Sequence, residues 1–478
     1  MSKSAPAPAP SPDLSFFDKY HFEPQPKAQK IINELVADFL SRCPGAAALA
    51  GRMKDDTGTR FADWVESIPC PPSPALKKSL LASGFTSDPQ PGAAECFEHK
   101  KAIFPRIVFH ASKTLRATIK VDSVADFAAT QGLTGPEHEI QGEPLGQYRR
   151  VCAFAGNGPK GAAELWAAER HGWRGFTIPD ADPAKSLMAA RHHEAFRRRH
   201  RDFDSDAKGF DLLHRLIDAA VRDIGRDWAC DLFFYSEREY WQRRNRAAQV
   251  QKHRQDTLGL GWANHDHHTY RSSRQCFTRL VSALEKLGFY CRERFYAGHD
   301  AGWGAQVLEQ PVTGVTIFAD VDMSPEELLG DFSHHGFEKD KGDLGTVGLW
   351  CGLHGEAILQ AGMHHLECQF DHAALVQQLQ HEGGIRTMAP FTTFPYLRQA
   401  FTEGETWEVS ESRLARLVKQ GHITAQQAAA FRGTGALGSH LENLERNDGF
   451  KGFNQQGVSD IIARTDPRKA AALALSGA

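Results

Sequence analysis

Three short segments of the sequence carry side chains that could hold a metal ion. Residues 266–271 (Asp-His-His-Thr-Tyr-Arg), 363–366 (Met-His-His-Leu) and 440–446 (His-Leu-Glu-Asn-Leu-Glu-Arg) each lie at an end of a strand-like stretch. Two His and one Asp or Glu on one side of an ion, with the other positions open, form the usual site for non-haem Fe(II) that activates O₂. The sequence has no local H-E-x-x-H motif, so the donors would have to come from three separate strands.

Strand parity selects between the two histidines of the second segment, because side chains alternate between the faces of a strand. His365 shares a face with Met363, Glu367 and Gln369, a largely polar set that suits a cavity. His364 shares the other face with apolar residues and suits packing. We therefore expect His365 to be the ligand.

The same parity groups the residues of the other two segments. In the first, His267 shares a face with His265, Thr269 and Arg271, so Arg271 should point into the same cavity as His267. In the third segment, a face holds His440, Glu442, Leu444 and Arg446. We expect His267 as the second imidazole ligand and keep His265 and His440 as reserve ligands.

The elements that must position these residues repeat within the C-terminal half. Residues 264–287 read as a strand followed by a helix with one apolar stripe, and strands are expected at 289–296, 303–309 and 315–318. Residues 363–370 and 373–380 repeat the strand-then-helix start. We expect an α+β fold in which paired βαβββ modules form an open, metal-holding barrel, with residues 406–431 inserted as a helical pair.

The remainder of the chain divides by composition and periodicity. An amphipathic helix is expected at 28–39, and short strands at 107–109, 117–121 and 148–154 suggest an α/β N-terminal half that could be a degenerate, metal-free copy of the same module. The expected organisation is a disordered tail (1–13), an N-terminal α+β domain (14–186), a helical connector (187–260), the metal-binding paired-module domain (261–462) and a C-terminal tail (463–478).

Bulk composition excludes several classes of protein. With 41% hydrophobic and 24% charged residues the chain has the composition of a soluble globular protein, and a formal charge of −3 argues against a general nucleic-acid binder. No apolar run reaches the ~18 residues of a membrane span. Nine dispersed cysteines without a C-x-x-C pair suggest free thiols in a reducing compartment, and hence a cytoplasmic location. A homo-oligomer is compatible with the sequence.

The last two segments resemble the vicinal oxygen chelate superfamily, and within it 4-hydroxyphenylpyruvate dioxygenase. Residues 362–366, with the later Leu375, Leu379, Gly383, Pro390 and Tyr396, are similar to its V-Q-H-[IL]-A strand, helix and R-G…P…Y-Y ending. Residues 442–446 and 449–454 resemble its E-I-I-Q-R…G-F-G-x-G-N-F signature. This resemblance implies that Glu442 binds iron and that residues 449–462 form a lid, with Phe450 or Phe453 closing on the substrate.

The first segment instead resembles the D-H-x-A-F-R motif of the 2-oxoadipate dioxygenase/decarboxylase (hydroxyglutarate synthase) family. That resemblance implies that His267 binds the metal and that Arg271 holds a substrate carboxylate. This family also has an E-x-x-Q-R-type ending, so both resemblances assign the third ligand to Glu442. Glu445 stands where both families tend to have Gln, and the insertion at 406–431 could reshape the pocket, so the substrate does not carry over.

The function that these residues and resemblances imply is an Fe(II)-dependent dioxygenase, an oxidoreductase that uses O₂ and a small 2-oxo acid. His267, His365 and Glu442 would bind Fe(II), with Mn, Zn or Ni as alternatives, and Arg271 would grip the substrate carboxylate by a bidentate contact. Arg446 could do the same, or pair with Glu442 or Glu445. Gln306 is a candidate polar contact from a cavity strand.

Two alternatives stay open. The first is another enzyme on the same scaffold, either an extradiol-type ring-cleaving dioxygenase or a divalent-metal lyase or isomerase of glyoxalase type. The second is a non-enzymatic small-molecule binding protein, against which the presence of all three expected ligands counts. Fold alone does not decide between them.

Overall fold

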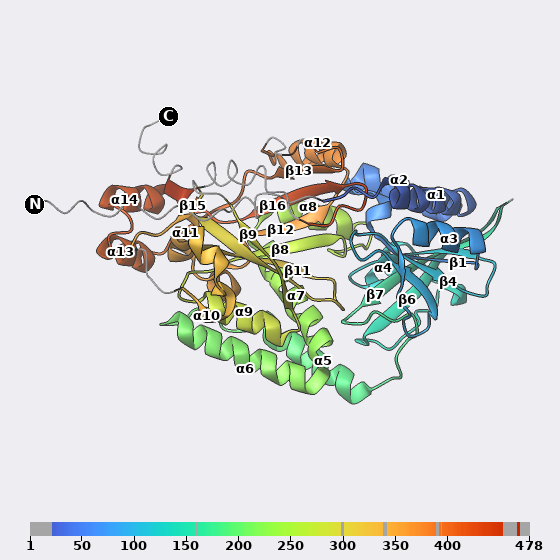
Figure 1. Cartoon of the computed structure of the whole chain (residues 1–478), viewed down its shortest axis with the longest axis horizontal. Coiled ribbons are helices and arrows are strands. Elements are labelled where there is room, and N and C mark those ends of the chain that lie inside the picture. Colours follow the sequence, from blue (N-terminus) through green and yellow to red (C-terminus); the bar gives the residue numbers. More distant parts are fainter. Residues whose placement is uncertain are drawn as a thin grey trace, which may run out of the picture.

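A computed structural model describes residues 22–158, 160–297, 301–337, 342–388, 392, 394–452 and 466–468 of the chain. Two seven-stranded mixed sheets, one in each half of the sequence, form its framework, and helices that connect the halves run along one side (Figure 1). The expected α+β class is confirmed. Within the described residues, no helix is long and apolar enough to cross a membrane.

The C-terminal sheet has the strand order β13-β16-β12-β8-β11-β10-β9. Its first module is a βαβββ unit, in which β8 pairs in parallel with β11 and the following strands pair antiparallel. The elements of this module are β8 (His265–Arg271), α9 (Phe277–Lys286), β9 (Tyr290–Tyr296), β10 (Trp303–Glu309) and β11 (Thr316–Asp322).

The second module repeats this arrangement with a reduced second strand. β12 pairs in parallel with β16, and β13 pairs antiparallel with β16. Among the described residues between α12 and β13, the one sheet-like pairing is an isolated bridge between Thr387 and Thr402. The modules join where β8 and β12 pair antiparallel, so the described strands form an open sheet. The elements are β12 (His365–Gln369), α12 (His372–Gly383), β13 (Leu397–Phe401) and β16 (His440–Arg446).

The expected insertion in the second module is a helical pair that packs on α11. Leu349 and Leu353 of α11 form one apolar cluster with Leu414, Leu417 and Phe431 of the insertion. The elements here are α10 (Phe332–His335), α11 (Thr346–His354), β14 (Thr406–Trp407), α13 (Glu411–Lys419), α14 (Ala425–Thr434) and β15 (Ala436–Leu437), with short turns at Glu326–Leu329 and Ala357–Ala361.

The N-terminal sheet has the same topology as the C-terminal one. Its order, β2-β3-β4-β1-β5-β7-β6, again has two strand–helix units joined through their first strands, with β1 parallel to β4 and β5 parallel to β7. The elements are α1 (Pro26–Arg42), α2 (Pro44–Thr57), a turn at Phe61–Asp63, β1 (Val65–Cys70), α3 (Pro74–Ala82), β2 (Thr86–Ser87), β3 (Glu95–Glu98), β4 (Arg106–Phe109), β5 (Leu115–Lys120), α4 (Val124–Thr130), a turn at Pro136–His138, β6 (Tyr148–Gly158) and β7 (Gly161–Arg170).

The connector helices cover one face of the C-terminal sheet and leave the other face for chemistry. Tyr270, Ile317 and Leu366 belong to the same apolar core as Phe233 and Phe234 of α7, and the Tyr270 ring lies 6.3 Å from that of Phe234. Because strand side chains alternate, the neighbours of these residues face the opposite side. The connector helices are α5 (Pro183–Arg197), α6 (Asp206–Ile224), α7 (Arg226–Gln242) and α8 (Arg246–Asp256).

Candidate metal centre

Two buried side chains and one partly buried side chain converge on the face of the C-terminal sheet that the connector helices leave uncovered. His267 of β8, His365 of β12 and Glu442 of β16 each offer one donor atom, and these atoms lie within 4.8 Å of one another. Glu442 Oε2 lies 3.3 Å from His365 Nε2 and 3.8 Å from His267 Nε2. The strands β8, β12 and β16 are neighbours in the sheet, which brings together residues that are far apart in the sequence.

The surroundings of these three groups favour a bound cation. Burial lowers the pKa of His267 to about 4, against the attraction of Glu442, and lowers the pKa of His365 well below its ordinary value. The imidazoles are therefore neutral, which is the form that binds metals. Burial also raises the pKa of Glu442 to about 6, against the attraction of His267. Two neutral imidazoles and a carboxylate at these separations form a donor set that fits a divalent ion.

One neighbouring side chain orients the carboxylate donor. The amide Nε2 of Gln399, on β13, donates a 3.0 Å hydrogen bond to Glu442 Oε1 and so leaves Oε2 directed at the imidazoles. A contact of this kind fixes the position of a metal ligand and tunes its basicity. Thr269 Oγ1 lies 2.8 Å from His365 Nε2, the nitrogen that would bind the ion, so a metal would replace this contact.

Glu367 is a second carboxylate at the site that we did not single out from the sequence. Its Oε2 lies 3.1 Å from His267 Nε2, and its residue pairs with Glu442 across β12 and β16. Burial, and then the charge of Glu442, raise the pKa of Glu367 well above its ordinary value. Strand parity had placed Glu367 on the cavity face beside His365, and that was the available signal.

Arg271 lies on the same face of β8 as His267 and is 3% exposed. Its guanidinium lies 5.6 Å from the centre of the Trp350 ring, and its Nε is buried without a hydrogen-bond partner among the described residues. The cross-strand neighbour Asp320 has its pKa raised to about 8 by burial, against the attraction of Arg271. A buried guanidinium in this setting is suited to hold the carboxylate of a ligand.

The structure does not bring Gln306 to this site. Gln306 pairs with Ala319 on the helix-covered face of the sheet. Its Nε2 donates to the Glu293 carbonyl at 2.8 Å, and its Oε1 accepts from Ser333 Oγ at 2.9 Å. The side chain is therefore engaged on the face opposite His267, which differs from the expectation of a cavity contact.

The other histidines near the site have separate contacts. His364 Nδ1 lies 3.0 Å from the Gly438 carbonyl oxygen, and its ring lies 5.5 Å from that of Trp350. The reserve ligands His265 and His440 have Nδ1 2.9 Å from the Trp262 carbonyl and 2.8 Å from the Thr402 carbonyl, respectively. None of these three belongs to the group of donors formed by His267, His365 and Glu442.

Of the two expected gate residues, the structure describes Phe450, whose role as a gate stays a prediction. Phe450 is 3% exposed, and its ring lies 5.2 Å from Phe22 and 5.7 Å from Tyr396, in a cluster with Leu397 and Leu444. Phe453 and the rest of the expected lid, residues 453–462, lie outside the described residues.

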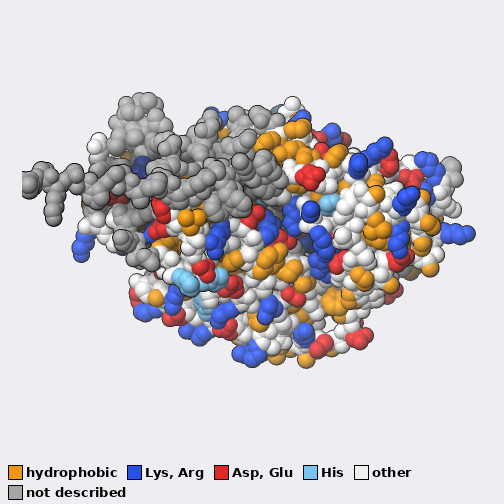
Figure 2. Space-filling view, in the orientation of Figure 1, with side chains coloured by type: hydrophobic (Ala, Val, Ile, Leu, Met, Phe, Trp, Pro, Cys, Tyr) orange, Lys and Arg blue, Asp and Glu red, His pale blue; other side chains and the backbone are white. Residues whose placement is uncertain are grey.

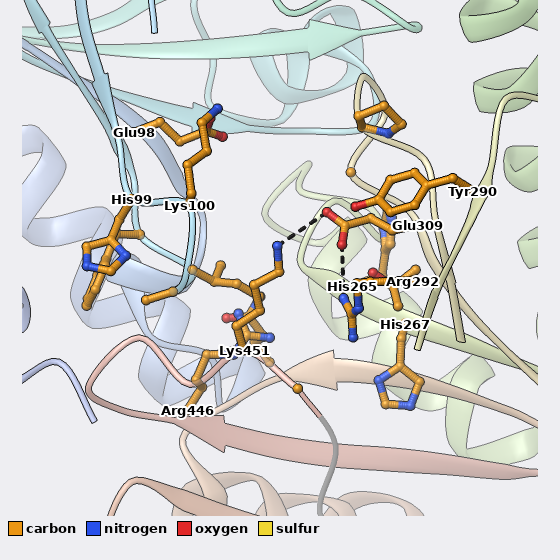
Figure 3. A pocket seen from close by; sticks show the side chains of 18 of the residues that line it. Glu98, His99, Lys100, His265, His267, Tyr290, Arg292, Glu309, Arg446 and Lys451 are labelled. Atoms are coloured by element: carbon orange, nitrogen blue, oxygen red, sulfur yellow. Dashed lines mark hydrogen bonds and ion pairs between the residues drawn. The ribbon is translucent and has the colours of Figure 1, made fainter. Parts of the chain in front are cut away.

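A cavity of about 560 Å³ opens beside His267, between the two sheets. Arg446, Lys451 and Arg292 line it, together with residues 98–100 and 102–104 of the N-terminal half (Figure 3). Glu309 forms ion pairs with Lys451, at 3.3 Å, and with Arg292, at 3.0 Å. Arg446 thus contributes to the wall of this cavity, outside the group of three donors.

Comparison with known proteins gives structural neighbours only. No family model and no curated protein matches the chain. A variant of 4-hydroxymandelate synthase from Streptomyces coelicolor is 14% identical, covers 73% of this chain and 96% of its own, and has a TM-score of 0.26. A glyoxalase superfamily protein from Ralstonia eutropha JMP134 is 12% identical, with coverages of 56% and 96% and a TM-score of 0.30.

A third neighbour is methylmalonyl-CoA epimerase from Mycobacterium tuberculosis, which is 13% identical, with coverages of 38% and 88% and a TM-score of 0.22. These neighbours are members of the glyoxalase/vicinal oxygen chelate superfamily, which the sequence motifs also resemble. Because the TM-scores are this low, the function is argued from the site itself.

Proposed function

We propose that this chain is a non-haem Fe(II)-dependent dioxygenase that acts on a small 2-oxo carboxylic acid. The observation that carries the proposal is the convergence of His267, His365 and Glu442 on the face of the sheet that also holds the buried guanidinium of Arg271. In the proposed reaction the substrate loses its carboxyl carbon as CO₂. One atom of O₂ enters the new carboxylate and the other enters a hydroxyl group on the same molecule.

His267, His365 and Glu442 would hold the ion, and Gln399 would keep Glu442 oriented. Bound there, Fe(II) supplies open coordination positions and the redox chemistry that O₂ activation needs. Arg271 would bind the substrate carboxylate by two parallel hydrogen bonds. The rings of Phe318, 4.5 Å from His267, and Phe401, 5.4 Å from His365, restrict water around the donors.

A second candidate function is a divalent-metal isomerase or lyase of glyoxalase type, and Glu367 is the observation that favours it. A second carboxylate 3.1 Å from His267 Nε2 could take a proton from a carbon next to a carbonyl group. Such an enzyme would turn over without consuming O₂.

The test is to purify the protein anaerobically, count bound iron and screen 2-oxo acids and catechols for O₂ uptake. We expect about one Fe(II) per chain and O₂ consumption coupled to CO₂ release from a 2-oxo acid. His365→Ala should abolish iron binding and O₂ consumption, whereas His364→Ala should retain the iron. Ring cleavage of a catechol would assign the extradiol alternative, and turnover with Zn or Ni under anaerobic conditions would assign the isomerase. Ligand binding without turnover under any of these conditions would leave a binding protein.

A further inference from the structure

A second group of metal-binding side chains lies on the other side of the C-terminal sheet. Glu285 of α9, Cys291 of β9 and His334 of α10 each offer a donor atom, and these atoms lie within 4.8 Å of one another. Cys291 pairs with Leu308, which points into the core beneath the helices, whereas His267 faces away from that core. Histidine side chains gather on the molecular surface over the α10 region in Figure 2, and His334 and its neighbour His335 are both exposed.

The imidazole of His334 is held between two carboxylates. Its Nε2 lies 2.8 Å from Glu285 Oε1, and its Nδ1 lies 2.9 and 3.0 Å from the two oxygens of Asp331. In metal sites a carboxylate on one ring nitrogen commonly fixes the ring so that the other nitrogen meets the ion. Asp331 holds Nδ1 of His334 in this way and leaves Nε2 for the group formed with Glu285 and Cys291.

The charges around the group favour a cation. Hydrogen bonds to the carboxylates of Glu285 and Asp331 raise the pKa of His334, and burial, followed by the charges of the same two carboxylates, raises the pKa of Cys291 to about 11. Arg294 is a cation near the group, with its Nη2 3.9 Å from Asp331 Oδ1. Two carboxylates within 3.0 Å of the His334 ring give the group a negative potential that would attract a divalent ion.

The backbone around these residues is anchored to the core. Phe332 packs its ring 5.6 Å from that of Phe277, which ties α10 to α9. Ser333 donates to Gln306, which ties α10 to β10. The donors therefore come from three elements that are already held together, and ordering them costs little on binding.

We propose that Glu285, Cys291 and His334 form a second divalent-cation site, which takes Zn(II), on the opposite side of the sheet from His267. A thiolate, an imidazole and a carboxylate are the ligands that Zn(II) prefers, whereas Mg(II) and Mn(II) prefer oxygen donors. Binding releases the proton of the thiol and the proton of the imidazolium to solvent. The bound ion would join α9, β9 and α10 by one coordination centre.

The test uses Co(II) as a spectroscopic substitute for Zn(II) in the full-length chain. Coordination by Cys291 should produce a thiolate-to-Co(II) charge-transfer absorption band that added Zn(II) removes. The candidate centre at His267, His365 and Glu442 has no thiolate, so the band does not report on that centre. A third group of converging donors, Asp206, Cys276 and Glu356, does contain a thiol, and Cys276→Ser is the control for it. The outcome of this test is thus independent of the proposed dioxygenase function.

Matched variants assign the band to particular side chains. Cys291→Ser and His334→Ala should abolish it, and Cys276→Ser and His335→Ala should retain it. Asp331→Asn should keep the band and weaken Zn(II) binding about 10- to 100-fold, as loss of an outer carboxylate does elsewhere. Melting curves without metal identify any variant that has lost its fold. The proposal is overturned if the wild-type chain gives no band, or if the band survives in folded Cys291→Ser or His334→Ala protein.

Discussion

Replacing each of the two buried carboxylates by its amide should separate the metal ligand from its neighbour. Glu442 Oε2 faces both imidazoles, at 3.3 and 3.8 Å, and its other oxygen is held by Gln399. Glu367 lies 3.1 Å from His267 and also contacts Glu442 and Gln399, but it does not belong to the group of converging donors. We therefore expect Glu442→Gln to lose the metal and Glu367→Gln to keep it.

The expected difference in affinity follows from charge. Two unit charges about 4 Å apart at an effective dielectric constant of about 20 interact by about 4 kcal/mol, and a divalent ion doubles this to about 8 kcal/mol. The amide oxygen in Glu442→Gln still offers a lone pair. We therefore expect a loss of at least about 4 kcal/mol, or roughly a thousandfold in affinity. Glu367→Gln alters the surroundings of His267 and Glu442 without removing a ligand, and should lower the affinity at most about 100-fold.

The assay is a competition titration of metal-free protein with Mn(II) against a chromophoric chelator. Mn(II) suits this purpose because it disfavours thiolate ligands and so does not report on Cys291. Gln399→Ala, which frees Glu442 to rotate, is the control for orientation and should weaken binding about 10- to 100-fold. Equal losses in Glu442→Gln and Glu367→Gln, or a larger loss in Glu367→Gln, would refute the assignment of Glu442 as the ligand.

Three further outcomes are expected. Arg271→Lys should keep the iron and the melting temperature but lose about 10- to 100-fold in kcat/KM, because Lys cannot form the bidentate contact; a lower melting temperature with unchanged kcat/KM would make Arg271 structural. Burial raises the pKa of Asp320 from 3.8 to about 8, so between these two pH values the folded chain keeps a proton that the unfolded chain has released. Asp320 therefore lowers the free energy of unfolding as the pH rises from 3.8 to about 8. Asp320→Asn should therefore raise the melting temperature of metal-free protein more at about pH 8 than at about pH 5, and an equal rise at both would show that Asp320 is ionised in the fold. His364→Ala should retain bound metal that His365→Ala loses, as measured by metal analysis, and the reverse result would show that our strand parity is wrong.

The strands and helices around the candidate site could be predicted because their signals are local. The apolar stripe of α9 and the polar and apolar alternation of β12 lie within single elements, and the structure has both elements where the pattern indicated. The helical periodicity of the insertion also predicted its two helices, α13 and α14. Parity along β8 and β12 then predicted that Arg271 faces the same side as His267.

Other features needed information that the pattern does not contain. Gln306 lies in β10, where nearly every side chain is buried on either face, so alternation could not show which face meets the ligands. The repeat in the N-terminal half was only suggested by the sequence, because β2 and β3 have two and four residues, too few for a periodic pattern. The aromatic packing of Phe450 depends on Phe22, which lies at the other end of the chain.

The two sheets share one topology but differ in how their buried charged groups are paired. This difference explains why the candidate metal centre lies in the C-terminal sheet. In the N-terminal sheet, Glu66 of β1 and Arg170 of β7 form a bidentate ion pair at 2.6 and 2.7 Å. His171 lies between Asp231 and Glu169 at 2.7 and 3.0 Å, and these carboxylates raise its pKa to about 10 despite burial.

Each of those charges is balanced by a protein side chain, and none of these groups belongs to a set of three converging donors among the described residues. In the C-terminal sheet, burial instead keeps the imidazoles of His267 and His365 neutral beside the carboxylate of Glu442. Neutral imidazoles cannot compensate the negative charge of the Glu442 carboxylate, whereas a divalent cation bound among these donors can. Among the described residues of both sheets, the same arrangement of strands thus positions an ion-pair network in one half and a set of metal donors in the other.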